Sequence, residues 1–208
     1  DYGWFGVGRD DGKEEGEFCP IFYRKDRMEL LDHGTFWLSE TPQIPGSRGW
    51  DAACNRVVTW GKFKDREANR IVYHFNTHFD PRGKTARLES AKLLWRKVKQ
   101  IAGELPTVVT GDFNMRESSA PYGIVTGEEM FDDTRSDLKD ARYASKTDHQ
   151  GPTSTFTNWK EMGPPETKID YIFVRNGVDV LTHEVLKDRF NGYYPSDHLP
   201  VFAKVGLD

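Results

Sequence analysis

The sequence has few cysteines, no long hydrophobic run and no excess of basic residues. Its two cysteines, Cys19 and Cys54, lack the spacing of a metal-binding motif, and they are compatible with either one disulfide or two free thiols. No apolar stretch approaches the roughly 20 residues of a transmembrane helix, so we expect no membrane span. The formal charge of -4 argues against indiscriminate binding to polyanions, which needs a strongly basic surface. It still allows a nuclease with a local basic groove.

What the sequence does contain is typical of a globular domain. Of its 208 residues 37% are hydrophobic, and 6 Trp, 8 Tyr and 13 Phe are enough for a substantial core. There is no internal repeat, low-complexity tract or linker, so we expect residues 1–208 to form a single domain. The chain starts at Asp1 with neither Met nor a targeting sequence, and we expect its natural beginning to lie upstream. The sequence indicates neither a localisation nor an oligomeric state.

Alternating hydrophobic residues predict many strands. We expect strands at residues 17–24, 28–32, 36–40, 55–63, 70–79, 106–110, 154–158, 168–174, 178–187 and 199–205. The first two flank Lys25, which predicts a hairpin, and the glycine-rich charged segment 6–16 before them predicts a loop. Residues 70–79 alternate most clearly, and the face that carries Asn76 and His78 is too polar for a simple core.

One long helix is also predicted. Residues 85–103 repeat apolar side chains with a helical period, among them Leu94 and Val98, and the strand at 106–110 follows directly. Shorter helices are predicted after Pro121 and near Asp137. A helix between strands suggests that helices pack on a sheet, so the expected fold class is mixed α/β.

The tetrapeptide Gly-Asp-Phe-Asn at residues 111–114 follows the strand predicted at 106–110. Asp112 and Asn114 are two positions apart, and in an extended segment such side chains point the same way. A carboxylate beside an amide can bind a hard divalent cation, orient a water or bind a phosphoryl oxygen. The alternative interpretation is a turn in which Asn114 serves as a local cap.

Two further segments place ionisable side chains beside strands. Asp197 and His198 precede the last strand, and histidine titrates near neutral pH, which suits acid–base chemistry; a surface turn is the alternative. Asp170 lies in the apolar run 168–174, where an ionised carboxylate needs a partner such as an imidazole. Its alternative role is to cap a turn at the start of the strand.

His78 ends the strand at 70–79, where it either donates to a phosphoryl oxygen or bonds to a loop carbonyl. Arg56 is either a guanidinium that faces phosphate or an ordinary solvated charge at the end of a strand. Three aromatic residues lie in predicted loops, where they either stack on a base or a sugar or join the core: Tyr122, Phe156 and Trp159.

Four motifs, in this order, resemble the endonuclease/exonuclease/phosphatase superfamily. They are Asn76-Thr77-His78-Phe79, Gly111-Asp112-Phe113-Asn114, Ile169-Asp170-Tyr171-Ile172-Phe173 and Ser196-Asp197-His198. Residues 6–60 are similar to a bacterial branch of it, and the resemblance covers nearly the whole chain. The superfamily includes deoxyribonucleases of the pancreatic type, abasic-site endonucleases, inositol polyphosphate 5-phosphatases, sphingomyelinases and mRNA deadenylases.

The resemblance implies a four-layer α/β/β/α sandwich of two mainly antiparallel sheets flanked by helices. It also implies a hydrolase of phosphoester bonds that depends on Mg²⁺ or Mn²⁺ and acts on a phosphorylated small molecule or a nucleic acid. The metal ligands that it implies are Asp112, Asn114, Asp197 and His198. The substrate-binding residues that we expect are Arg56, Tyr122 and Phe156.

The resemblance also implies a role for each of the other motif residues. Asp112 and Asn114 position the attacking water and stabilise the transition state. Asp170 orients His198, which acts as a general base or contacts the phosphate. His78 contacts the scissile phosphate.

One departure from the family pattern leaves a second hypothesis open. The family's first strand, with an Asn, and the helix after it, with a metal-binding Glu, have no counterpart in this sequence. Glu17 lies in a different motif, as do Glu14 and Glu15, and we do not expect these residues to replace that Glu. The alternative to an enzyme is therefore a non-catalytic binding module that kept the fold, although the retained polar motifs favour the enzyme.

Overall fold

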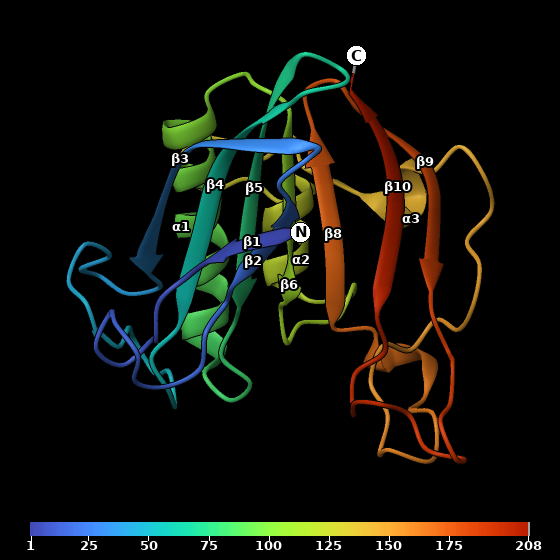
Figure 1. Cartoon of the computed structure of the whole chain (residues 1–208). Helices are drawn as coiled ribbons and strands as arrows, with labels where there is room; N and C mark the ends of the chain where they lie inside the picture. Colours follow the sequence, from blue (N-terminus) through green and yellow to red (C-terminus); the bar gives the residue numbers. More distant parts are fainter. Residues whose placement is uncertain (208) are drawn as a thin grey trace.

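A six-stranded sheet forms the centre of the computed structural model, which describes residues 1–207 (Figure 1). Its strands lie in the order β3–β4–β5–β6–β8–β7, with the bounds β3 Met28–Trp37, β4 Val57–Asp65, β5 Arg70–His78, β6 Thr107–Asp112, β7 Lys139–Asp140 and β8 Asp170–Arg175. Neighbouring strands of this sheet are antiparallel except β5 and β6, which are parallel. The parallel pair needs a crossover, which α1 (Lys84–Ala102) supplies.

Helices cover one face of this sheet. The predicted apolar stripe of α1 is buried, and Leu94 and Val98 join a core cluster with Phe75 of β5 and Val109 of β6. The carboxylate of Asp51 caps the first turn of α1, because its Oδ1 accepts the backbone N–H of Ala86 at 2.6 Å. The short helix expected after Pro121 is present as α2 (Ala120–Thr126), and it lies beside α1.

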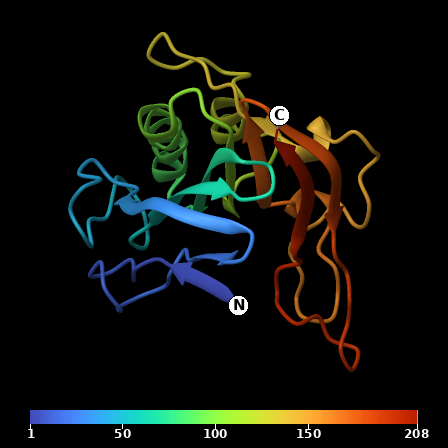
Figure 2. The ribbon, with the colours of Figure 1, turned by 45° about the horizontal axis from the view of Figure 1, so that its top comes forward.

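Four strands cover the opposite face, in two separate antiparallel pairs (Figure 2). The first pair is β1 (Tyr2–Phe5) with β2 (Ile21–Arg24), and the second is β9 (Val178–Val185) with β10 (Val201–Leu207). Ile21 of β2 packs against Phe63 and Val72 of the central sheet. The predicted sandwich of mainly antiparallel sheets with helices is therefore confirmed, and its second layer consists of these two pieces.

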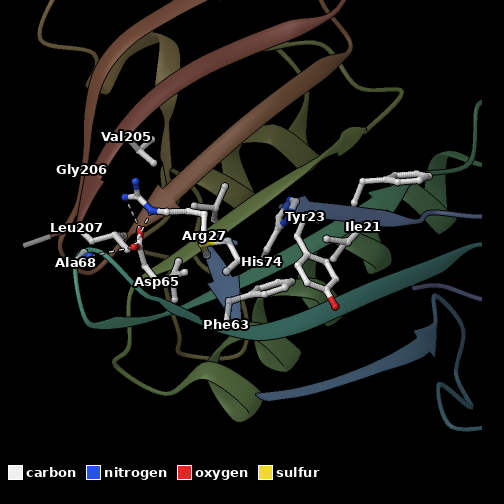
Figure 3. Close-up of a pocket in the computed structure, with 14 residues that line it drawn as sticks. Ile21, Tyr23, Arg27, Phe63, Asp65, Ala68, His74, Val205, Gly206 and Leu207 are labelled. Carbon is white, nitrogen blue, oxygen red and sulfur yellow. Dashed lines mark hydrogen bonds and ion pairs between the residues drawn. The ribbon is translucent and has the colours of Figure 1, made fainter. Parts of the chain in front are cut away.

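An apolar groove of about 430 Å³ lies between the two pieces (Figure 3). Ile21, Phe63 and Leu207 contribute to its lining, and the ion pair between Arg27 and Asp65 lies beside it. None of the expected site residues lines this groove, so it is distinct from the site described below.

The hairpin expected around Lys25 does not form. β2 pairs with β1, whereas β3 pairs with β4, so the turn after β2 carries the chain from one layer of the sandwich to the other. Residues 28–37 form one ten-residue strand with an irregular register between Leu30 and Asp32, where two shorter strands were expected. Polar residues in the middle of β3 interrupt the hydrophobic pattern, so the sequence indicates two short strands in place of one long strand.

The segment between β6 and β8 differs most from the prediction. The helix expected near Asp137 begins later, as α3 (Ala141–Ala144), and a single 3-10 turn, η1, spans Pro165–Thr167. Within residues 154–158, Phe156 and Thr157 form isolated bridges in place of the expected strand, and Ser154 Oγ accepts the backbone N–H of Phe156 at 3.2 Å. Both cysteines are free thiols, and none of the described helices is long and apolar enough to cross a membrane.

His183 of β9 contacts a second histidine, His149. His183 is 1% exposed, and its Nδ1 lies 2.9 Å from Nδ1 of His149. Nε2 of His149 lies 3.0 Å from the carbonyl oxygen of Pro152. A carbonyl only accepts hydrogen bonds, so His149 carries its proton on Nε2 and accepts at Nδ1 the proton of His183. Burial lowers the pKa of His183 to about 4.

This pair should make the stability of the fold depend on pH. The unfolded chain protonates His183 below about pH 6.5, whereas the folded chain resists protonation until about pH 4, so this contribution is lost as the pH falls through that window. Between pH 7 and pH 5 we expect His183 to remove about 2 kcal/mol from the free energy of unfolding. Urea denaturation at both pH values measures it. His183→Asn keeps an N–H donor but cannot titrate, and an equal pH dependence in this variant would contradict the assignment.

Candidate active site

Three polar residues lie in one row where β5 and β6 end and β8 begins. The register pairs His78 of β5 with Asp112 of β6, and it pairs Asp112 with Asp170 of β8. Because β5 and β6 are parallel and β8 is antiparallel to them, two strand ends and one strand start meet at the same edge. The position of these three residues beside one another is therefore built into the hydrogen-bond register of the central sheet.

Asp112 and Asn114 converge through a turn and not through an extended strand. Oδ1 of Asp112 accepts the backbone N–H of Asn114 at 2.8 Å, and the φ of Asn114 is 46°. The side-chain amide of Asn114 donates to Oδ2 of Asp112 at 3.1 Å and to the carbonyl of Phe79 at 3.0 Å. The tetrapeptide was interpreted either as a carboxylate beside an amide or as a turn. The structure combines the two, because the turn brings the carboxylate and the amide together.

Gly111 is required for this arrangement. Its φ is 153°, and a Cβ atom at this position would lie 2.0 Å from the carbonyl oxygen of Thr77. A side chain would therefore push β6 away from β5 immediately before Asp112. Glycine allows the close approach that aligns Asp112 with its neighbours.

Asp170 and His198 form a hydrogen-bonded pair. Nδ1 of His198 lies 2.8 Å from Oδ2 of Asp170, as expected from the sequence. The hydrogen bond to Asp170, which outweighs the opposing effect of burial, raises the pKa of His198 to about 8. Thr155 Oγ1 accepts the backbone N–H of Asp170 at 3.1 Å and thereby fixes the start of β8. The pair holds a proton on Nδ1 and leaves Nε2 of His198 for another partner.

The donor atoms of Asp112, Asp170 and His198 lie within 4.8 Å of one another. Burial raises the pKa of Asp170, and the negative charge of Asp112 adds to this effect. A divalent cation would relieve the repulsion between the two carboxylates, and carboxylate and amide oxygens are the ligands that Mg²⁺ and Mn²⁺ prefer. The residues therefore fit a hard cation. Asp197, which we expected among the ligands, is not part of this group.

Comparison with known proteins gives the family of this chain. The profile of the Endonuclease/Exonuclease/phosphatase family matches residues 11–198. The chain belongs to this family. Its members are hydrolytic, and they include metal-dependent nucleases and phosphatases. A cavity of about 270 Å³ is lined by both Asp112 and Asp170.

Two solved structures of the family are close to this one. An endonuclease/exonuclease/phosphatase from Bacteroides vulgatus is 44% identical, with a TM-score of 0.90, over 100% of this chain and 77% of that chain. A mannosyl-6-phosphatase from Bacteroides thetaiotaomicron is 36% identical, with a TM-score of 0.88, over 99% of this chain and 77% of that chain. Nocturnin from Drosophila melanogaster is 26% identical over 91% of this chain, which spans 32% of that protein's length.

Glu17 lies beside His78 at the end of the row, although the sequence did not single it out for a role there. Its Oε2 lies 3.5 Å from Nδ1 of His78 and 3.7 Å from Nη1 of Arg56, and it accepts from Arg9 Nη1 at 2.6 Å. Nε2 of His78 lies 3.1 Å from Oδ2 of Asp112. Glu17 enters from the segment before β2, which belongs to the other layer of the sandwich, so no local spacing signals its contact with His78.

Arg56 is not a solvated charge at a strand end. It is 5% exposed, and its Nε and Nη1 atoms have no hydrogen-bond partner among the described residues. Its nearest carboxylates are Asp80 and Glu17, each at 3.7 Å. The oxygens of Asp80 are already taken by backbone N–H groups such as those of Ala53 and Gly83. Arg56 therefore retains N–H groups that an anion can accept.

Tyr122 was expected to contact the substrate, but the structure buries it in the core. Tyr122 is 5% exposed in α2, packs against Tyr171 and Phe173, and donates its hydroxyl to Asp140 at 3.2 Å. Its position on the inner face of a helix places it in the core. Phe156, by contrast, is exposed, and its ring lies 5.2 Å from that of His198.

Lys168 anchors the start of β8 in the protein interior. It is 4% exposed, and its Nζ lies 2.7 Å from Asp140 and 2.7 Å from Glu117. Lys168→Met should lower the free energy of unfolding by about 3 kcal/mol, because it leaves the buried carboxylate of Asp140 without its cation. Urea denaturation measures this loss. Lys139→Met, at an exposed position of β7, is the control, and an equally small effect of both substitutions would refute the argument.

Proposed function

We propose that this chain hydrolyses phosphomonoesters of small hydroxylated molecules, with Mg²⁺ or Mn²⁺ as its cofactor. The observation that carries this proposal is the row of His78, Asp112 and Asp170 across three paired strands, with His198 held against its end. Such a row presents carboxylates and imidazoles to one point, as a clamp for a phosphoryl group and its counterion requires.

Asp112, Asn114 and Asp170 would hold the cation, which would offset the negative charge of the phosphoryl oxygens. Asp112 and Asn114 also orient the attacking water through their oxygen atoms. His198, with a pKa of about 8, carries two protons at neutral pH, so Nε2 can donate to a phosphoryl oxygen while Asp170 holds Nδ1.

Arg56 and His78 bind the phosphoryl group in this proposal. Arg56 supports the assignment because it offers two buried N–H groups without partners, which an anion would satisfy. His78 lies between Glu17 and Asp112, and these carboxylates keep its ring facing the row.

Two observations favour a small substrate over a polynucleotide. The chain carries a formal charge of -4, whereas tight binding to a nucleic acid backbone depends on clustered basic residues. The relative that is 36% identical is a mannosyl-6-phosphatase, which supports a sugar phosphate as the substrate of this chain.

Release of inorganic phosphate tests the proposal. The purified protein with Mn²⁺ should release phosphate from mannose 6-phosphate faster than it cleaves bis-(p-nitrophenyl) phosphate or a single-stranded oligonucleotide, and EDTA should abolish the reaction. Preference for the diester or the oligonucleotide would identify a nuclease instead. Absence of turnover on all three by a folded protein would favour the non-catalytic binding module.

A further inference from the structure

Four exposed aromatic side chains stand on two loops next to His198. They are Phe156, Trp159, Phe190 and Tyr193, and we call them the aromatic wall. Trp159 is 50% exposed and Tyr193 is 48% exposed. The two loops, residues 156–163 and 186–198, extend below β8, β9 and β10 in Figure 1. The ring of Phe156 meets the ring of His198 edge-on, so the wall begins at the proposed site.

Backbone hydrogen bonds join the two loops into one unit. Leu199 donates to the carbonyl of Thr155 at 2.8 Å, Thr157 donates to that of Asp197 at 2.6 Å, and Tyr194 donates to that of Trp159 at 2.8 Å. These bonds continue outward from the strand that follows His198. The aromatic wall is therefore positioned by the same framework as the imidazole.

Trp159 has a backbone conformation that its side chain disfavours. Its φ is 75°, in the left-handed region where a glycine or an asparagine is common and a bulky residue is an outlier. Two hydrogen bonds hold it there: the Trp159 N–H donates to Thr157 Oγ1 at 3.2 Å, and the Tyr194 N–H donates to the Trp159 carbonyl. Its indole is half exposed, so core packing does not account for a tryptophan at this position.

The charge around the wall indicates an uncharged ligand. The two loops carry three basic residues, Lys160, Lys187 and Arg189, and three acidic residues, Glu161, Asp188 and Asp197. Lys160 lies over the ring of Tyr193 at 4.8 Å. A surface for a nucleic acid strand needs a basic excess that these loops lack. Aromatic rings without such an excess suit the apolar faces of sugar rings.

The geometry points to a phosphorylated oligosaccharide as the substrate: the site takes the phosphorylated sugar at the chain end, and the aromatic wall binds the sugar rings that follow it. This inference rests on the proposed phosphomonoesterase activity. It assigns to Trp159 and Tyr193 the role of distinguishing long from short substrates, because they lie farther along the loops than Phe156, which contacts His198.

Comparing a long and a short substrate tests the inference. The protein should hydrolyse 6-phosphorylated mannotriose with a kcat/KM about tenfold above that for mannose 6-phosphate, mainly through a lower KM. Trp159→Ala and Tyr193→Ala should each remove most of this advantage, with a loss on mannose 6-phosphate at least about fivefold smaller than the loss on the trisaccharide. Trp4→Ala, which removes an exposed indole from β1, should leave both values unchanged. Equal kcat/KM for both substrates, or equal losses on both in the variants, would overturn the inference.

Binding of unphosphorylated mannotriose separates the wall from the chemistry. Isothermal titration should detect weak saturable binding to the protein, and Trp159→Ala should abolish it. If this binding is seen while mannose 6-phosphate is not hydrolysed, the proposed function is wrong but the assignment of the aromatic wall to sugar binding is supported. If the trisaccharide does not bind in either form, the wall fails. Salt-dependent binding of a single-stranded oligonucleotide that requires Trp159 would replace the sugar ligand with a nucleic acid.

Discussion

Asp112→Ala should lower kcat/KM for a phosphomonoester by on the order of 10³-fold. Asp112 occupies the centre of the row, where it contacts His78 at 3.1 Å, receives two hydrogen bonds from Asn114 and lies in register with Asp170. Its removal takes away a carboxylate proposed to hold the cation and to orient the attacking water. Steady-state kinetics at several Mn²⁺ concentrations measure the loss.

Excess Mn²⁺ distinguishes the two tasks assigned to Asp112. If Asp112 served the cation alone, saturating Mn²⁺ would restore most of the activity, whereas a role in orienting the water keeps kcat low. Asp148→Ala removes an exposed carboxylate outside the row and should leave kcat within about twofold of the unsubstituted protein. A comparable loss in both variants, or a folded Asp112→Ala protein with unchanged kinetics, would remove Asp112 from the site.

The elements that build the row were predictable because their sequence patterns are strong and local. β5 alternates over nine residues, α1 repeats apolar residues over 19, and both were expected within one or two residues of their bounds. Strand pairing was not predictable in the same way. β2 pairs with β1 across the long loop 6–20, and the turn near Lys25 suggested a nearer partner, because a short turn favours a hairpin unless the two strands belong to different layers.

The site shows the same contrast. The Asp170–His198 pair was implied by the resemblance to the family, whereas the residues alone indicated only that a carboxylate in an apolar strand needs a partner such as an imidazole. The contact of Glu17 with His78 joins two layers of the sandwich, and no spacing in the sequence reports it. Tyr122 was assigned to the substrate for a related reason: a short helix was expected after Pro121, but its sequence does not show which of its sides faces the core.

His198→Ala should also lower kcat/KM by on the order of 10³-fold, because it removes the proton donor to the phosphoryl oxygen. Nδ1 of His198 is committed to Asp170 at 2.8 Å, so Nε2 is the nitrogen left for substrate. The loss should fall on kcat more than on KM if the imidazolium acts mainly in the transition state. Steady-state kinetics at neutral pH, together with a thermal melt that shows an intact fold, test this expectation.

The pairing with Asp170 is tested by combining substitutions. Asp170→Asn keeps the shape of the side chain but removes the charge that raises the pKa of His198, so it should also reduce kcat. Because part of the effect of Asp170 on phosphate passes through His198, the double variant Asp170→Asn/His198→Ala should be slower than His198→Ala alone by less than the loss that Asp170→Asn causes on its own. Multiplying losses would mean that Asp170 acts independently of the imidazole, as a ligand of the cation alone. An unchanged rate in Asp170→Asn would refute both roles, since its carboxylate lies beside that of Asp112 in the same row.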